Sequence, residues 1–392
     1  MSVEYDRCEL TKELSRVFIS PASANKALGV VRPVVSLKAE KMSTKWKGTF
    51  YSAACLSSTN DPFVVAIGIS ESEENNVSWQ WFLEQLQESC PILYSDLVKS
   101  SLSEYKKHVF IGNLRNGLKE ALFTVFPNNH SIYCALSLEN LVEEKYGRHI
   151  SIKILEIAST FSCRREETLM SEIQRINEDA AEFINGIDPK TWKSTEWTQE
   201  DIILPNRYGV IACFIPHVDE YLGNHRGKRI TWMDYLEGVM ESCCNRISYS
   251  RVKYKGFLPS KVIPSMETRM TQYWSIADDL DVLEINDNDV VEYKTLEPDH
   301  KGGKRLKMTQ ILKPRRAWCS CSLWQENSYP CVHACAYFKE IEGLNFDDIL
   351  RGHISEYYKY GSLQILYEDN IKTVMVDNIK SDWETKPPYQ ST

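Results

Sequence analysis

Long apolar runs, a basic excess and nucleotide-binding loops are all missing from this sequence. No stretch of about 18 apolar residues occurs, so no membrane-spanning helix is expected. The charged start, MSVEYDRCELTKELSR, lacks an apolar core and argues against a secretory signal. The formal net charge of −8 argues against a uniformly basic nucleic-acid coat, although a local basic patch is compatible with it. The sequence contains no Walker, G-x-G-x-x-G or G-x-S-x-G motif. It therefore gives no indication of a P-loop NTPase, a dinucleotide-binding enzyme or an α/β-hydrolase.

The cysteines do not form the pattern of a disulfide-rich secreted protein. Twelve are present, most of them dispersed along 392 residues, whereas disulfide scaffolds are small and cysteine-dense. The length and the 43% hydrophobic content are enough for two or three domains with their own cores. We therefore expect reduced and mostly buried cysteines in a nuclear or cytosolic protein.

One segment concentrates four soft metal ligands. The stretch CSCSLWQENSYPCVH has the spacing C-x-C-x9-C-x-H, and thiolates with an imidazole suit tetrahedral zinc. Four protein ligands close the coordination shell, so the sequence predicts one structural Zn²⁺. We expect AWCSCSLW to be a strand that turns into a loop, and CVHACAYFKEI to be a helix in which Cys335 packs rather than ligates. The predicted ligands are Cys319, Cys321, Cys331 and His333.

This pattern resembles the SWIM zinc finger, whose signature is C-x-C-x(n)-C-x-H. The longer form C-x-C-x-x-W/F-Q-x-x-x-x-P-C-x-H-A, typical of Mutator-like (MULE) transposases and related far-red-response proteins, is similar to CSCSLWQENSYPCVHA. Three upstream segments extend the resemblance to the MULE family: KWKGTFYSA, SWQWFLEQL and NGLKEALFTVFPNNHSIYCALSL. Altogether it covers roughly residues 30–375.

The order of predicted elements favours an α/β (α+β) fold. Strands are expected at 31–36, 49–57 and 62–70, followed by a helix at 76–89. A strand at 108–113, a helix that ends at Pro127 and a strand at 131–136 come next. Three strands, a helix, a strand, a helix and a strand is the order of a ribonuclease-H-like core, a mixed sheet flanked by helices.

The predicted domain organisation combines this core with the family resemblance. The expected parts are an N-terminal helical segment at 1–30, the first part of the core at 31–138, an all-helical insertion at 139–205, a return to the core at 206–260, a SWIM zinc-finger region at 261–375 and a C-terminal tail at 376–392.

The resemblance also implies where catalytic carboxylates should lie. Transposases of this family use two aspartates and a glutamate to hold two divalent metals. The corresponding positions here are Lys38, Asn113 and His217, so all three are degenerate and we expect no strand cleavage or transfer. We expect these three side chains to lie within reach of one another, and Lys38 to pair with Glu40 or Glu220. In the alternative, Glu40 and Glu220 are the true ligands of an active transposase whose register is misaligned.

A basic stretch without any acid leads into the predicted zinc site. Its cations could follow a phosphate backbone, with Gly302-Gly303 forming a tight turn. The alternative is a solvated hairpin that balances the acidic run just upstream. The cations are Lys301, Lys304, Arg305, Lys307, Lys313, Arg315 and Arg316.

The leading hypothesis is a zinc-binding, transposase-derived protein without strand-transfer activity. It would act in the nucleus as a DNA- or protein-binding factor, with double-stranded DNA as the expected nucleic-acid partner. The two alternatives are an active transposase and a pure protein-interaction scaffold.

Overall fold

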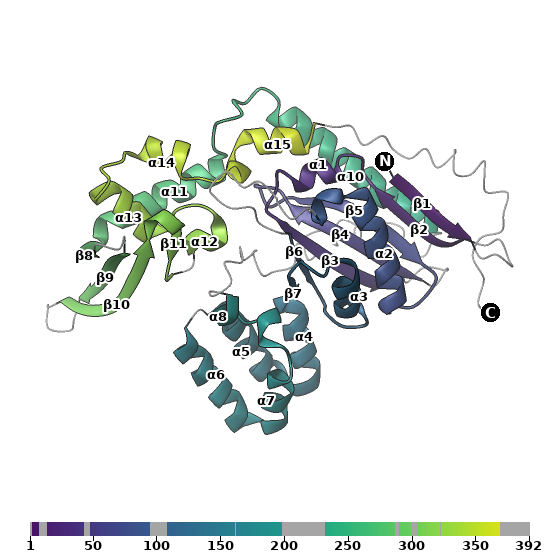
Figure 1. The fold of residues 1–392 in the computed structure, drawn as a ribbon, viewed down its shortest axis with the longest axis horizontal. Helices are drawn as coiled ribbons and strands as arrows, with labels where there is room; N and C mark the ends of the chain where they lie inside the picture. The colour runs from purple at the N-terminus through teal and green to yellow at the C-terminus, as the bar shows by residue number, and fades with distance from the viewer. Residues whose placement is uncertain are drawn as a thin grey trace.

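The computed structural model describes residues 2–7, 14–42, 48–94, 108–160, 162–197, 232–286, 290–298, 304–321 and 323–368. Figure 1 shows three parts: a large sheet with its helices, a bundle of helices between residues 135 and 197, and a C-terminal part with a smaller sheet. None of the helices in these ranges combines the length and the apolarity that a membrane span needs.

Among the described residues, the large sheet is mixed and has seven strands in the order β1-β2-β5-β4-β3-β6-β7. Strand β3 pairs in parallel with β6, and β6 pairs in parallel with β7, whereas the other neighbours are antiparallel. The strands are β1 (Ser2–Arg7), β2 (Leu14–Ser20), β3 (Val34–Lys41), β4 (Thr49–Leu56), β5 (Pro62–Ser70), β6 (Val109–Gly112) and β7 (Ser131–Tyr133).

Most of the predicted elements of this part are present. Strands β4 and β5 lie close to their expected positions, and helix α2 (Asn76–Ser89) has the expected bounds. Strand β3 begins three residues later and ends five residues later than expected. The expected helix before Pro127 is α3 (Leu118–Val125). Strand β7 is shorter than expected, because the chain turns into a helix directly after Cys134. The mixed α/β class is therefore confirmed.

The expected N-terminal helical segment is wrong. Residues 2–7 and 14–20 form a β-hairpin that adds two strands to the sheet, and the only helix described before residue 31 is the short α1 (Ala24–Leu28). The stretch RVFIS is rich in β-branched and aromatic residues, and β5 offers it an edge to pair with. The pairing of β2 with β5, which are about 50 residues apart in sequence, stabilises the strand more than local helix propensity stabilises a helix.

Helix α2 covers one face of the sheet through an aromatic cluster. Phe82 packs edge-on against Phe18 of β2 and stacks on Tyr51 of β4, with centroid distances of 5.6 Å in each case. Trp79 meets Tyr51 edge-on at 4.9 Å. Gly68 of β5 makes this approach possible, since a Cβ there would lie 2.9 Å from the Phe82 ring. Burial of each such ring contributes about 1.5–3 kcal/mol, which fixes α2 on the sheet.

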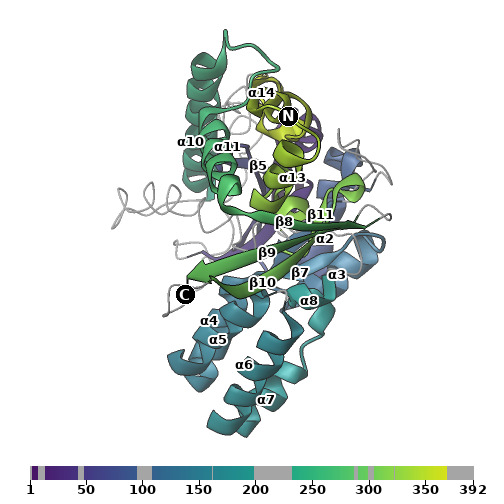
Figure 2. The ribbon, with the colours of Figure 1, turned by 90° about the vertical axis from the view of Figure 1, so that its left-hand side faces the viewer.

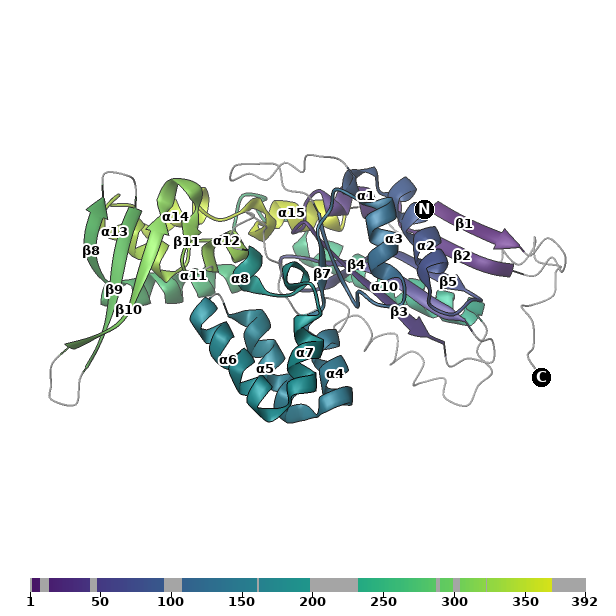
Figure 3. The ribbon, with the colours of Figure 1, turned by 60° about the horizontal axis from the view of Figure 1, so that its bottom comes forward.

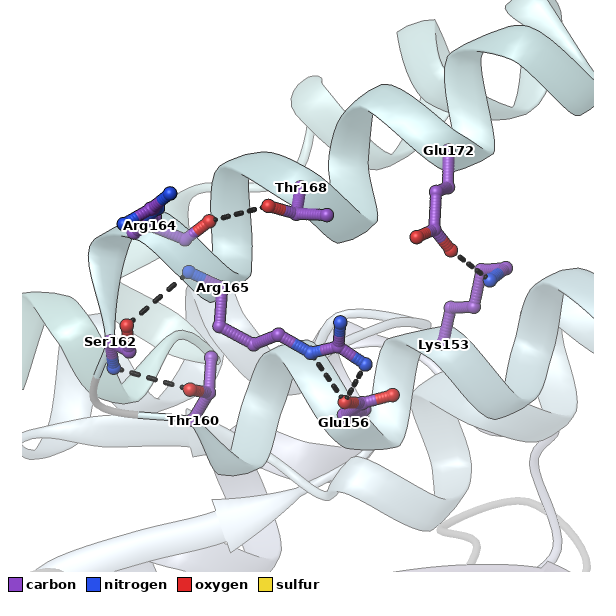
Figure 4. Close-up of polar contacts among 8 residues, drawn as sticks. All are labelled: Lys153, Glu156, Thr160, Ser162, Arg164, Arg165, Thr168 and Glu172. Atoms are coloured by element: carbon purple, nitrogen blue, oxygen red, sulfur yellow. Dashed lines mark hydrogen bonds and ion pairs between the residues drawn. The ribbon is translucent and has the colours of Figure 1, made fainter. Parts of the chain in front are cut away.

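In the described residues from 135 to 197, five helices follow β7 without an intervening strand. They are α4 (Ala135–Tyr146), α5 (Arg148–Ser159), α6 (Cys163–Ile176), α7 (Glu178–Asn185) and α8 (Ser194–Trp197). Figure 4 shows the polar contacts between α5 and α6: Lys153 pairs with Glu172 at 2.5 Å, and Nε of Arg165 donates to Glu156 at 2.7 Å. The Ser162 hydroxyl caps α6 by accepting from the Arg165 amide at 3.3 Å.

The C-terminal part contains a second sheet in the order β11-β10-β9-β8. Figure 3 places its strands at the end of the molecule opposite to β1 and β2, and Figure 2 shows its helices gathered on one side of the sheet. The elements are α10 (Trp232–Tyr254), α11 (Pro264–Ile276), β8 (Asp281–Asn286), β9 (Val290–Pro298), β10 (Lys304–Lys313), β11 (Trp318–Cys319), α12 (Leu323–Asn327), α13 (Val332–Glu340), α14 (Phe346–Gly352) and α15 (Tyr360–Leu366).

The chain returns to the large sheet after the second one. Helix α15 packs beside α1 and α10, and Glu368 pairs with Lys26 of α1. Arg251 of α10 donates to the carbonyl of Tyr367 at 2.9 Å. Tyr367 is 1% exposed and packs against Phe63 at the start of β5. The segment that follows the second sheet therefore anchors the C-terminal part of the chain to the large sheet.

Candidate metal centre

The four predicted ligands come from a strand end and a helix start. Cys319 is the last residue of β11, and Cys321 follows it in the turn before α12. Cys331 is the N-cap residue of α13, and His333 lies in the first turn of that helix. In each ligand pair a single residue separates the two ligands. The first pair lies at the end of a strand, and the second pair lies where a helix begins.

The ligand atoms converge on one point. The three Sγ atoms and the His333 ring nitrogen all lie within 4.8 Å of one another. The Nδ1 atom of His333 lies 3.6 Å from Sγ of Cys319 and 3.9 Å from Sγ of Cys331. Tetrahedral zinc with ordinary bond lengths separates its ligand atoms by about 3.5–3.8 Å. The donor set and its spacing therefore fit Zn²⁺.

Burial and crowding shape the acid–base behaviour of the three thiols. Burial raises the pKa of Cys331 well above its ordinary value, and the neighbouring Cys319 and Cys321 raise it further. The pKa of Cys319 is raised to about 12, chiefly by its hydrogen bond with Cys321. Hydrogen bonds from Cys319 and Cys331 lower the pKa of Cys321, which ionises first. Zinc takes thiolates, so its binding must displace protons from this cluster.

Side chains around the cluster hold the ligand backbone in place. Gln325 of α12 clamps Cys319, since its Oε1 accepts from the Cys319 amide at 3.0 Å and its Nε2 donates to the Cys319 carbonyl at 2.8 Å. Trp324 meets Phe338 of α13 edge-on at 5.6 Å, which ties α12 to α13. Such supporting contacts fix the orientation of metal ligands.

Cys335 lies two residues beyond His333, about one helical turn after Cys331, and does not join the cluster. It is 0% exposed, and burial raises its pKa to about 12. Its thiol packs in the core of the finger, as expected from helical spacing.

Comparison with known protein families agrees with this geometry. Residues 302–339 match the model of the SWIM zinc finger. The chain carries a SWIM finger. Its four ligands, Cys319, Cys321, Cys331 and His333, are arranged to bind a metal ion, consistent with structural zinc. No curated protein matches the chain.

Apart from Lys301, the basic stretch that precedes the ligands lies within the region that matches the SWIM finger. Lys304, Arg305 and Lys307 belong to strand β10, and Lys301 lies outside the described residues. Arg315 and Arg316 are exposed in the turn between β10 and β11. Lys313 sits over the ring of Trp318, with its Nζ 4.8 Å from the centroid. The turn therefore places two cations three and four residues before Cys319 along the chain.

Two of the three positions that the family resemblance aligns with catalytic carboxylates lie together, in the part of the chain that holds the large sheet. Lys38 of β3 and Asn113, which follows β6, line one cavity of about 270 Å³. The Lys38 ammonium pairs with Glu40 at 2.5 Å. The Asn113 side-chain oxygen accepts from the Tyr133 hydroxyl at 2.9 Å. His217 and Glu220 lie outside the described residues.

Several residues of the metal centre and of the cavity beside Lys38 were not predicted from the sequence. Arg269 of α11 donates to the hydroxyl of Tyr329, two positions before Cys331, at 2.9 Å. Sixty residues separate these partners, and no local pattern reveals such a pairing. Likewise, Ser36 and Glu74 line the cavity with Lys38. Strand alternation could have indicated Ser36, because residues i and i+2 share a face.

Proposed function

We propose that this protein is a catalytically inactive derivative of a MULE transposase that acts in the nucleus as a DNA-binding factor. The observation that carries the proposal is the convergence of four metal ligands directly after a basic turn in the SWIM finger. Zinc bound there would hold β11 and α13 together, so that the neighbouring cations face one way. Binding to a protein partner is the second candidate, since a finger can recognise either.

The arrangement of the large sheet supports a ribonuclease-H-like origin. Three antiparallel strands, β5, β4 and β3, lie side by side, and the parallel strands β6 and β7 continue the sheet from β3. A block of helices follows β7, where the family resemblance implies an insertion. The proposed division is a core at 31–138, an insertion at 139–205, a return to the core at 206–260 and a SWIM region at 261–375. Residues 198–231 of this span lie outside the described residues.

The chemistry around Lys38 supports the loss of catalysis. An ammonium at this position repels divalent cations instead of attracting them. Glu40, the substitute ligand on the same strand, already pairs with Lys38. Asn113 supplies a neutral amide that is hydrogen bonded to Tyr133. This combination lacks the carboxylate pair that a two-metal mechanism needs.

Binding of the zinc-loaded chain to a short DNA duplex, measured by fluorescence anisotropy over a range of salt concentrations, tests the proposal. Replacing Lys304, Arg305, Lys307, Arg315 and Arg316 with glutamine should lower the slope of log affinity against log salt by roughly 0.9 for each lost phosphate contact. A matched variant that replaces five exposed cations elsewhere keeps the same change in net charge. These are Lys41, Lys119, Arg164, Lys190 and Lys255.

Each outcome of this test has a clear meaning. A loss of affinity specific to the finger variant supports DNA binding through the basic stretch. Absence of binding by the wild type at low salt would contradict it and favour the protein-interaction scaffold. Cleavage of DNA that depends on Mg²⁺ or Mn²⁺ and disappears in Glu40→Ala would contradict the loss of catalysis.

A further inference from the structure

The cavity beside Lys38 is built where parallel strands end and helices begin. Its lining includes Lys38 and Ser36 of β3, Asn113 after β6 and Cys134 after β7. Strand β6 pairs only with Val34 to Ser36, and the next three residues of β3, Leu37 to Ala39, line the cavity. Crevices at the carboxyl ends of strands are the usual ligand sites of open α/β sheets. A space of about 270 Å³ is suited to a small molecule or to one group of a larger one.

The first turn of helix α4 forms one wall of this cavity. Leu136, Ser137 and Asn140 line it together with Cys134, the N-cap residue, whose side chain makes no capping hydrogen bond. The first amide groups of a helix have no acceptor within the helix, and the helix dipole adds positive potential there. This wall therefore offers amide N–H groups suited to an anion.

Ser36 provides independent evidence for a ligand. It is 1% exposed, it lines the cavity, and its hydroxyl has no hydrogen-bond partner among the described residues. A hydroxyl that lines the cavity and bonds to no described residue can donate a hydrogen bond to a bound acceptor. Ser36 also shares a strand face with Lys38 two positions later, so both groups project to the same side of β3.

The carboxylates near the cavity limit the charge of its ligand. Glu40 pairs with Lys38, and Glu74 at the rim accepts hydrogen bonds from Trp79 at 3.0 Å and from Asn116 at 2.9 Å. The positive charge of the Lys38 ammonium and of the α4 N-terminus is offset by the two carboxylates, so the site does not favour a doubly charged anion. A singly charged group can exchange with Glu40 at the Lys38 ammonium without adding much repulsion.

We propose that this cavity is a metal-independent binding site for one singly charged oxyanion, held by Lys38, the Ser36 hydroxyl and the first amide groups of α4. Within the described part of the chain, the residues grouped as possible metal ligands are those of the SWIM finger. The oxyanion belongs either to a small carboxylate or phosphate compound or to a phosphodiester of a nucleic-acid strand. The site is separate from the finger and does not depend on the function proposed for it.

Isothermal titration of the zinc-loaded full chain with dimethyl phosphate and with acetate, in buffer without added Mg²⁺ or Mn²⁺, tests this site. Lys38→Gln should weaken binding at least about tenfold, which corresponds to about 1.4 kcal/mol. Lys41→Gln is the matched control, because Lys41 lies on the same strand but on its other face and is exposed. Its binding should equal that of the wild type.

A second variant guards against a loss of folding. Ser137 is the third residue of α4, where a carboxylate stabilises a helix N-terminus. Ser137→Asp should therefore melt no lower than the wild type, yet abolish oxyanion binding because its own carboxylate occupies the site. If the wild type binds neither probe, or if Lys38→Gln and Ser137→Asp bind like the wild type, the proposal is wrong.

Titration with a DNA oligonucleotide then distinguishes the two sources of the oxyanion. A salt slope lowered by about 0.7–0.9 in Lys38→Gln, with Lys41→Gln unchanged, assigns the site to a phosphodiester. An unchanged slope together with lost dimethyl phosphate or acetate binding assigns it to a small molecule. The finger variant decides DNA binding separately, so failure of one proposal leaves the other measurable.

Discussion

Arg269 on α11 donates a hydrogen bond to the hydroxyl of Tyr329 at 2.9 Å, which joins this helix to the loop that carries Cys331. Tyr329 is 2% exposed and meets Tyr358 edge-on at 5.4 Å. The Tyr358 hydroxyl in turn donates to the carbonyl of Asn327 at 2.8 Å. The loop between α12 and α13 is therefore held from two sides before any metal binds.

Removal of the Tyr329 hydroxyl should loosen this loop. Tyr329→Phe keeps the buried ring but removes the acceptor of Arg269, whose side chain is exposed, so we expect a cost of about 0.5–1.5 kcal/mol. We expect a lower melting temperature and faster zinc release to a colorimetric chelator. Tyr94→Phe is the control, because Tyr94 is 55% exposed. Equal zinc release from both variants would show that the hydrogen bond does not support the metal loop.

Zinc content should follow the four ligands and not the fifth cysteine. Cys331→Ser should lower bound zinc well below one per chain and increase hydrogen exchange across residues 317–340, while the large sheet stays protected. Cys335→Ala should keep its zinc, since that thiol lies outside the cluster. Because burial raises the pKa of Cys331, zinc affinity should also fall as pH falls. Metal analysis of reduced protein checks both variants.

Local patterns predicted the elements that local forces determine. The alternation and apolar runs of β4 and β5, the helical spacing of α2 and the ligand spacing of the finger all act within about 15 residues. The mixed sheet, and the placement of the zinc ligands at a strand end and a helix start, could be predicted from the sequence for this reason.

Contacts between distant segments were not predictable in this way. The N-terminal strands depend on an edge offered by β5, about 50 residues later. The Arg269–Tyr329 hydrogen bond and the Ser36 hydroxyl in the cavity depend on how helices and strands pack in three dimensions. A periodic pattern in one segment carries no information about its partner in another.

Acid should destabilise the fold through His108. This side chain is 1% exposed, its Nε2 donates to the Leu28 carbonyl at 3.3 Å, and its Nδ1 has no partner. Burial lowers the pKa of His108 from 6.5 to about 4. Between these values the unfolded chain binds a proton that the folded chain does not, so stability falls as pH falls from 6.5 towards 4. The loss amounts to roughly 3 kcal/mol at most.

Urea unfolding at pH values between about 4.5 and 7.5 measures this effect. Zinc release from the finger also depends on pH, so the informative quantity is the difference between the wild type and His108→Gln. That difference should shrink as the pH is lowered, because glutamine does not titrate. His149→Gln is the control, since His149 is exposed. Parallel pH profiles for the wild type and His108→Gln would show that His108 is not responsible.

A glycine series should separate backbone strain from steric overlap in the loop beside the cavity. Gly117 has φ +88° and caps α3, and a Cβ there would overlap the backbone nitrogen of Asn76 at the start of α2. Gly256 has φ +100° but nothing within 4 Å, whereas Gly352 has neither constraint. Alanine should cost about 1–2 kcal/mol at Gly256 from the left-handed backbone alone. It should cost more, about 2–4 kcal/mol, at Gly117. At Gly352, near the end of α14, alanine should be neutral or slightly stabilising. Thermal and urea unfolding give the ranking of the three variants. A destabilisation by Gly117→Ala no larger than that by Gly256→Ala would show that α2 and this loop are not in tight contact.

Gly117→Ala should also weaken oxyanion binding, since Asn113 lies in the same loop.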